Sequence, residues 1–356
     1  MTDTTTATTP QVTADRTHQP RRRQGTRIFS GVKPTGHLTL GNYLGAMRRW
    51  AEEDQHRAES LFCVVDLHAL TVEHDPARIR RLSRQTAGLL LASGLDPEVC
   101  TVFAQSHVDA HTRLMYLLEC VAGDGEMRRM IQYKEKSVRA QATGQSVRLS
   151  LLTYPALMAA DILAYGATEV PVGEDQAQHV ELTRDLAERF NQRYGHTFVV
   201  PKATVPTVAA RVMDLQDPSV KMGKSHAATS GIVYLLDEPE AVAKKVRRAV
   251  TDSEPGVSYD REARPGVANL LEILSSCTGE EPGVLAEGYD RIGALKSDTA
   301  DAVVELLRPL RTRHAEISAD PSYVDGVLRE GAARARELAR PTVDAAYEAI
   351  GLLPPV

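Results

Sequence analysis

Two lysines three residues apart, Lys221 and Lys224, stand beside a glycine and a hydroxyl group in residues 221–225 (KMGKS). A short segment of this composition can bring two ammonium groups onto a polyphosphate and stabilise negative charge on a leaving group. An exposed basic loop that binds nothing has the same composition. The lysines therefore become informative only if a second phosphate site exists elsewhere in the chain.

Residues 29–47 (FSGVKPTGHLTLGNYLGAM) contain a candidate for that second site. A β run ends at Phe29, a turn with Gly31, Pro34 and Gly36 follows, and we expect a helix from about residue 40 to 53. The first N–H groups of a helix lack partners inside it, and the helix dipole adds positive charge, so a phosphate can bind there. A purely structural turn is the alternative.

A third feature is a carboxylate inside an apolar helix. We expect this helix to open at Tyr154-Pro155 and to end before Gly166, and its apolar surroundings are typical of a buried helix. A buried Asp161 must be matched by fixed hydrogen bonds or used by a ligand. Helical spacing places four residues near its face: Tyr154, Leu157, Met158 and Tyr165. This wall around one acceptor suits an indole, whose N–H only donates, and a structural N–H clamp is the alternative.

Apolar runs alternate with helical periodicity along the first part of the chain. We expect strands at residues 27–29, 61–65, 100–104, 169–172 and 198–200, with helices between them. This alternation predicts an α/β fold with a Rossmann-like, doubly wound parallel sheet, followed by a helical C-terminal domain. Such sheets bind ligands at the carboxyl ends of their strands, where His68 lies. A hydrogen-bonded structural histidine is equally consistent with that position.

Glu174 and Asp175 open the helix that we expect to close at Gly195. Two acidic side chains at a helix N-terminus interact favourably with the helix dipole, but their negative charge repels phosphate. This turn should therefore bind ribose hydroxyls or an ammonium group. Val170 and Val172, on one face of the preceding strand, are expected to line the pocket of Asp161.

Composition excludes several classes of protein. The chain has 356 residues, 42% of them hydrophobic, and no apolar run approaches the ~18 residues of a membrane span. Its four cysteines lack the spacing of a metal site, which indicates reduced thiols and no structural zinc. The net charge of −5 argues against bulk capture of nucleic acid but allows local basic patches. We interpret residues 1–25 as a disordered tail, although a transit peptide is harder to exclude than a secretion signal.

Taken together, residues 39–42 (TLGN) and 221–225 (KMGKS) resemble the two nucleotide-binding signatures of class I aminoacyl-tRNA synthetases. Residues 154–191, which begin YPALMAADILAYGATEVPVGEDQ, resemble the central block of the bacterial tryptophanyl-tRNA synthetases. The resemblance covers residues 27 to about 351. It implies a cytoplasmic, homodimeric tryptophan–tRNA ligase whose substrates are L-tryptophan, ATP and tRNA(Trp).

The resemblance also implies a division of the chain and a set of site residues. A catalytic domain would span residues 26–225, rejoined by a last helix at about 331–356, and a helical anticodon-binding domain would span 226–330. The implied ATP site comprises Lys33, Pro34, Thr35, Gly41, Asn42, Gly173, Glu174, Asp175, Val212, Lys221, Met222, Gly223, Lys224 and Ser225. The catalytic residues among and beside them are Lys221, Lys224, Thr39 and Asn42. No protein metal site is implied, because Mg²⁺ would be held mainly by ATP.

The implied tryptophan site is centred on Asp161 as acceptor for the indole N–H. Its other members are Phe29, Gly31, His68, Tyr154, Met158, Val170, Val172 and Gln176. The basic residues 123–147, which include Lys136, are interpreted as a solvated helix, with contact to a tRNA acceptor stem as the alternative.

Two positions depart from the family pattern. Gly223 stands where the lysine loop usually has serine, and Lys33 stands where bacterial relatives commonly have glutamine. We hypothesise that Lys33 adds a cation to the site and lowers sensitivity to tryptophan-like inhibitors, as an auxiliary isoform would require.

Three rival functions share parts of the pattern. A catalytically silent paralogue acting as a regulator or RNA-binding protein would need neither lysine, and the presence of both counts against it. A tyrosine-specific synthetase would need partners for a phenolic hydroxyl. A small-molecule adenylyltransferase would not need the helical domain after residue 226.

Overall fold

The computed structural model describes residues 25–142, 144, 146–204, 212–223 and 229–353. Residues 1–24 of the predicted tail, together with Lys224 and Ser225, lie outside these residues. The side chains of Arg139, Glu174 and Asp175 are likewise outside the description.

The centre of the molecule is a parallel sheet of five strands in the order β3-β2-β1-β4-β5, so the predicted α/β fold with a parallel sheet is confirmed. The strands are β1 (Arg27–Val32), β2 (Glu59–Val64), β3 (Thr101–Ala104), β4 (Glu169–Pro171) and β5 (Lys202–Thr204). The chain moves outward from β1 to β3 on one side and then from β4 to β5 on the other. The strand order therefore reverses between β1 and β4, where doubly wound sheets bind their ligands.

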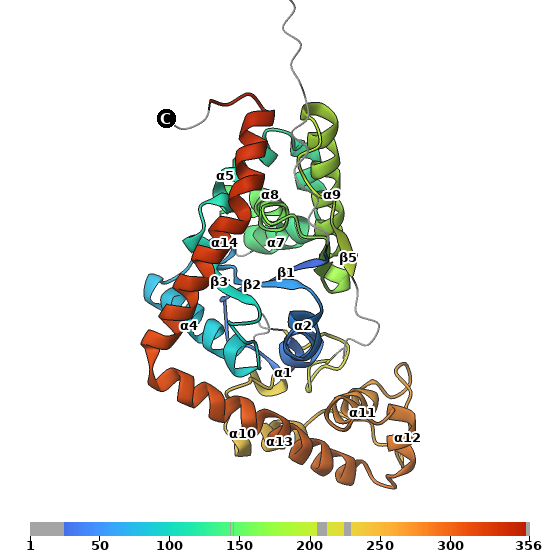
Figure 1. Cartoon of the computed structure of the whole chain (residues 1–356). Helices are drawn as coiled ribbons and strands as arrows, with labels where there is room; N and C mark the ends of the chain where they lie inside the picture. The colour runs from blue at the N-terminus through green and yellow to red at the C-terminus, as the bar shows by residue number, and fades with distance from the viewer. Residues whose placement is uncertain (1–24, 143, 145, 205–211, 224–228, 354–356) are drawn as a thin grey trace, which may run out of the picture.

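Helices cover both faces of the sheet (Figure 1). One face carries α4 (Pro76–Ala92) and a helical stretch made of α1 (Leu40–Asn42), wider turns at Tyr43–Met47 and Trp50–Asp54, and α2 (Gln55–Arg57). The other face carries α5 (Ala110–Glu119), α8 (Leu149–Leu163) and α9 (Glu174–Tyr194), with α6 (Asp124–Arg129) and α7 (Ile131–Ala142) beside them. Alternate residues of β2 enter the two cores, since Phe62 and Val64 join the first and Leu61 and Cys63 the second.

The helix that carries Asp161 begins earlier than the sequence predicts. It starts at Leu149, and Pro155 lies inside it instead of at its first turn. A proline inside a helix removes one backbone hydrogen bond. Leu151, Ala156 and Leu157 are buried on either side of it, and their packing offsets that loss.

The last strand also differs from the prediction of residues 198–200. The side chain of Asn191 accepts hydrogen bonds from the Thr197 and Phe198 amides and donates to the Phe198 carbonyl. These backbone groups are therefore used by a side chain instead of a neighbouring strand. Pairing with β4 begins four residues after Phe198, at Lys202.

The chain after residue 229 is helical. A short turn at Thr229–Gly231 leads to α10 (Pro239–Arg247), α11 (Pro265–Thr278), α12 (Pro282–Glu287) and α13 (Ile292–Ala319), and α10 and α11 pack on α13. The last helix, α14 (Pro321–Ala349), returns along the edge of the sheet beside β3 (Figure 1). No helix of the described residues is long and apolar enough to cross a bilayer.

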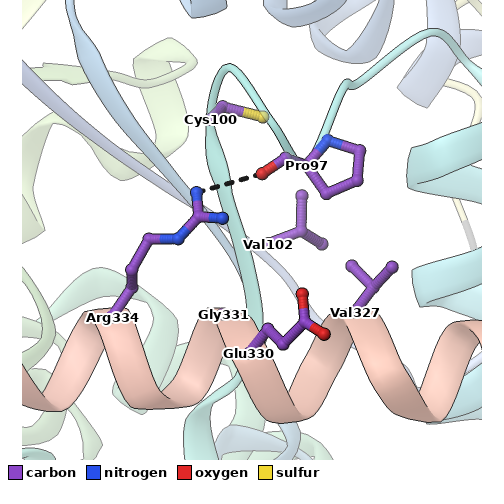
Figure 2. A pocket seen from close by; sticks show the side chains of 7 residues that line it. All are labelled: Pro97, Cys100, Val102, Val327, Glu330, Gly331 and Arg334. Atoms are coloured by element: carbon purple, nitrogen blue, oxygen red, sulfur yellow. Dashed lines mark hydrogen bonds between the residues drawn. The ribbon is translucent and has the colours of Figure 1, made fainter.

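Glycine permits the close approach of α14 to β3. A Cβ atom at Gly331 would lie 1.9 Å from the carbonyl oxygen of Val102, so a larger residue would push the helix away. Figure 2 shows Gly331 on the helix and Val102 on the neighbouring strand, with Arg334 of the next turn donating to the Pro97 carbonyl at 3.0 Å. Helix α14 thus packs directly against β3, the edge strand of the sheet.

Candidate active site

A cavity of about 440 Å³ lies at the reversal point of the sheet, between β1 and β4. The two strands pair at a single register position, Ile28 with Glu169, and the cavity is lined by residues that follow it on each strand. All nine residues predicted to bind tryptophan line this cavity. Residues predicted for ATP also line it: Lys33, Thr35, Asn42 and Gly173.

Asp161 lies in the wall of the cavity and is only 1% exposed. Its Oδ1 accepts hydrogen bonds from Gln105 Nε2 and His111 Nδ1, both at 2.7 Å, and its Oδ2 is 2.8 Å from His68 Nε2. Burial alone would raise the pKa of this carboxyl, but the charges and hydrogen bonds of His111 and His68 lower it to about 2. The carboxylate is therefore ionised at neutral pH and already held by fixed donors.

Aromatic rings stand close to this carboxylate. Phe29 of β1 stacks on Tyr165 with ring centres 5.7 Å apart, and His68 meets the edge of Tyr154 at 6.1 Å. Tyr154 is held by a hydrogen bond of 2.6 Å between its hydroxyl and His179 Nε2. Of the four residues predicted to form a wall near Asp161, Tyr154 and Met158 line the cavity, whereas Leu157 and Tyr165 are buried and do not line it.

Two lysines line the same cavity. Lys33 Nζ donates to Thr71 Oγ1 at 3.1 Å, and burial together with the charge of Lys136 lowers the pKa of Lys33 to about 8. Lys136 of α7 donates to Gln132 and lies 5.6 Å from the centre of the Tyr154 ring. Lys136 is exposed, as expected for a solvated helix, and it also lines the cavity.

The first helix begins with a capping box. Thr39 Oγ1 accepts from the Asn42 amide at 3.3 Å, and Asn42 Oδ1 accepts from the Thr39 amide at 3.0 Å. The Leu40 amide donates to the Val233 carbonyl at 2.8 Å. Two of the first helical N–H groups are therefore used inside the protein, and less of this helix end is available to an anion than the sequence predicts.

The structure brings the two signature segments together. A Cβ atom at Gly41 would lie 3.4 Å from the Met222 carbonyl oxygen and 3.6 Å from Val212 Cβ. The Met222 amide donates to the Val212 carbonyl at 3.0 Å, and Met213 and Lys221 form an antiparallel bridge. Lys221 is exposed beside this contact and Gly223 is half-buried.

Two more of the predicted ATP residues, Pro34 and Gly173, lie in turns that border the cavity. Pro34 is buried in the turn between Lys33 and Thr35. Gly173 precedes α9 and accepts from the Gln176 amide at 2.9 Å.

Sequence reasoning missed several residues of the site. Gln105 follows β3 at the carboxyl edge of the sheet, so the rule that selected His68 could have found it. His111 is a polar residue on the otherwise apolar buried face of its helix, which is the kind of signal that revealed Asp161, but the sequence analysis did not select it. Other cavity residues not predicted include Ser30, Val32, Ala46, Met47, Trp50 and Thr71.

Residues 21–308 match the sequence model of the family described as tRNA synthetases class I (W and Y). The chain belongs to this class I synthetase family. A Streptomyces coelicolor relative named tryptophan–tRNA ligase 1 is 76% identical over 93% of this chain and 98% of its own length.

Solved synthetase structures agree with this assignment. The tryptophanyl-tRNA synthetase of Mycoplasma pneumoniae has a TM-score of 0.86 at 34% identity and covers 92% of this chain and 98% of its own. That of Campylobacter jejuni, complexed with ADP and tryptophan, has a TM-score of 0.78 at 30% identity, covering 92% of this chain and 100% of its own. The prediction that this synthetase is a tryptophan–tRNA ligase is confirmed, and the tyrosine-specific alternative is not supported.

Proposed function

We propose that the cavity between β1 and β4 is where this synthetase binds L-tryptophan and joins it to ATP. The observation that carries the proposal is Asp161, an ionised carboxylate 1% exposed in the wall of an apolar cavity. A buried acceptor of this kind matches an indole N–H. An amino acid without that group would leave the acceptor without its hydrogen bond. The loss of binding free energy would be larger than that caused by a mismatch in shape alone.

ATP binds where the two signature segments meet. Gly41, Val212 and Met222 are in contact, and Lys33, Thr35 and Asn42 extend from there into the cavity. The complex of the Campylobacter jejuni relative with ADP and tryptophan supports a nucleotide beside the amino acid. Mg²⁺ would enter with ATP, on the phosphate oxygens.

The first step requires no general base, because the tryptophan carboxylate is ionised at neutral pH. Its oxygen attacks the α-phosphorus, the bond to the β-phosphate breaks, and pyrophosphate leaves. In the second step a ribose hydroxyl at the 3′ end of tRNA(Trp) attacks the acyl carbon, and AMP leaves. Positioning and stabilisation of charge on pyrophosphate carry the catalysis, and Lys221 and Lys224 supply that charge.

The division into domains remains a proposal. Residues 26–225 together with the end of the chain would form the catalytic domain, and residues 226–330 would read the anticodon. The contact of Gly331 with β3 agrees with a return to the catalytic domain near residue 331. We also expect a homodimer that acts in the cytoplasm, where tRNA charging serves translation.

Lys33 supports the proposal of an inhibitor-tolerant isoform. It places a half-buried ammonium group in the same cavity as Asp161. A tryptophan-like inhibitor that lacks the carboxylate of tryptophan would meet this cation without an anion to pair with it. The enzyme would therefore bind such an inhibitor less well than tryptophan.

Amino-acid-dependent ATP–pyrophosphate exchange tests the central proposal. The wild type should exchange with tryptophan and not with tyrosine, and Asp161→Ala should lose tryptophan exchange by about 10³-fold in kcat/KM, as expected for a buried polar contact. Glu316→Ala, which removes an exposed carboxylate on α13, is the matched control. Undiminished exchange by Asp161→Ala would overturn the assignment of Asp161, and exchange with tyrosine would overturn the assignment of the pocket.

A further inference from the structure

Behind Asp161 lies a chain of buried polar groups that does not line the cavity. His111 of α5 and Tyr165 are both 0% exposed, as is Gln105. His111 Nδ1 is 2.7 Å from Asp161 Oδ1, and His111 Nε2 is 2.8 Å from the Tyr165 hydroxyl. Every member of this chain is bonded to the next, from the tyrosine to the carboxylate.

The direction of these hydrogen bonds follows from chemistry. Asp161 is ionised and can only accept, so His111 Nδ1 carries a hydrogen. Burial raises the pKa of Tyr165 well above its usual range, so its hydroxyl keeps its proton and can form the hydrogen bond with His111 Nε2. Asp161 and Tyr165 thus hold the two ring nitrogens of His111, and with them the position of the ring.

The two oxygens of the Asp161 carboxylate have different hydrogen-bond partners. A carboxylate oxygen offers two lone-pair sites, and both sites of Oδ1 are taken by His111 and Gln105. Oδ2 faces His68, a residue of the cavity wall. The orientation of the carboxylate is therefore set by groups that no substrate touches.

We propose that His111 is a positioning residue for tryptophan selection, which with Gln105 and Tyr165 holds Asp161 so that Oδ2 meets the indole N–H. This rests on the proposed role of Asp161. Without His111 the carboxylate can rotate, and a rotated acceptor no longer aligns with the ring N–H, since hydrogen bonds weaken steeply away from linear geometry. Only ligands that donate this hydrogen bond should be affected.

The test compares tryptophan with its analogue that has sulfur in place of the indole N–H, β-(3-benzothienyl)alanine. The KM of tryptophan and the Ki of the analogue are measured by ATP–pyrophosphate exchange. His111→Phe, which keeps a ring, should raise the KM of tryptophan about tenfold and the Ki of the analogue less than about twofold. The KM of ATP should stay within about twofold of wild type in the same assay.

Two milder variants keep the proposal testable if His111→Phe does not fold. His111→Asn retains an N–H near the Nδ1 position and should restore part of the preference for tryptophan. Tyr165→Phe removes only the hydroxyl and should raise the KM of tryptophan about threefold. A purely structural role would raise the values for tryptophan and analogue together, and that result, or no change in either, would overturn the proposal.

Asp161→Ala in the same assay tests the role of Asp161 as indole acceptor separately from the positioning role of His111. If this variant loses the preference for tryptophan and the His111 variants keep it, only the positioning role is wrong. If Asp161→Ala itself keeps the preference, the proposed indole acceptor is wrong and the positioning role falls with it.

Discussion

The two sides of the cavity are built differently. On the indole side, Asp161 is 1% exposed and is bonded to three side chains before any ligand arrives. On the side where the two signature segments meet, Lys221 is exposed, and the contacts around Gly41 are made mainly by backbone atoms and small side chains. In the proposed mechanism, selection of the amino acid depends on a rigid acceptor, whereas stabilisation of phosphate charge depends on cations on flexible stems. Substitutions on the two sides should change different kinetic constants.

Substitution of Lys221 should give the largest difference between the effect on kcat and the effect on the KM of tryptophan. Lys221→Ala should lower kcat for pyrophosphate exchange by about 10²–10³-fold, because one preorganised charge at the leaving group is lost. The KM of tryptophan should change less than about threefold, because the indole side is untouched. Lys244→Ala, at an exposed lysine of α10, is the control in the same exchange assay. A large rise in the KM of tryptophan without loss of kcat would show that the two sides are not separable.

A smaller effect is expected at Lys33, whose pKa is lowered to about 8 by burial and by the charge of Lys136. The ammonium form dominates at pH 7 and the neutral form above pH 8. If only the ammonium form attracts ATP, the KM of ATP should rise up to about tenfold between pH 7 and pH 9. In Lys33→Gln the KM of ATP should be high and independent of pH in this range. In Lys33→Arg the KM of ATP should be low and likewise independent of pH.

The same Lys33 variant tests tolerance to inhibitors. Lys33→Gln should bind an indole-based tryptophan analogue more tightly than the wild type does. If neither the KM of ATP nor inhibition by this analogue changes in Lys33→Gln, Lys33 has no role at the site and the isoform hypothesis fails.

The sequence revealed Asp161 because a carboxylate in an apolar helix conflicts with its surroundings, and a conflict of this kind is visible without a fold. The residues that resolve the conflict, Gln105 and His111, come from other elements and could be assigned only once α5, α8 and β3 were packed together. Lys136 was missed for a similar reason. A lysine on a polar helix looks solvated until tertiary structure places it beside Tyr154.

The predicted ends of helices and strands were wrong where side-chain contacts outweighed the preferences of the local sequence. Pro155 is a good first helical residue, yet buried neighbours extend α8 back to Leu149. Phe198 is a good strand residue, yet Asn191 binds its backbone. The parallel sheet itself was predictable, because alternation of apolar strands and helices requires it.

The most direct test of the account is the NMR shift of the indole N–H proton of ¹⁵N-labelled tryptophan bound to the enzyme. A hydrogen bond to the Asp161 carboxylate should move this proton downfield of its position in free tryptophan, and a residual complex of Asp161→Ala should lack that displacement. A bound resonance that stays at the position of free tryptophan, or that is the same in both proteins, would contradict the claim that Asp161 selects the substrate.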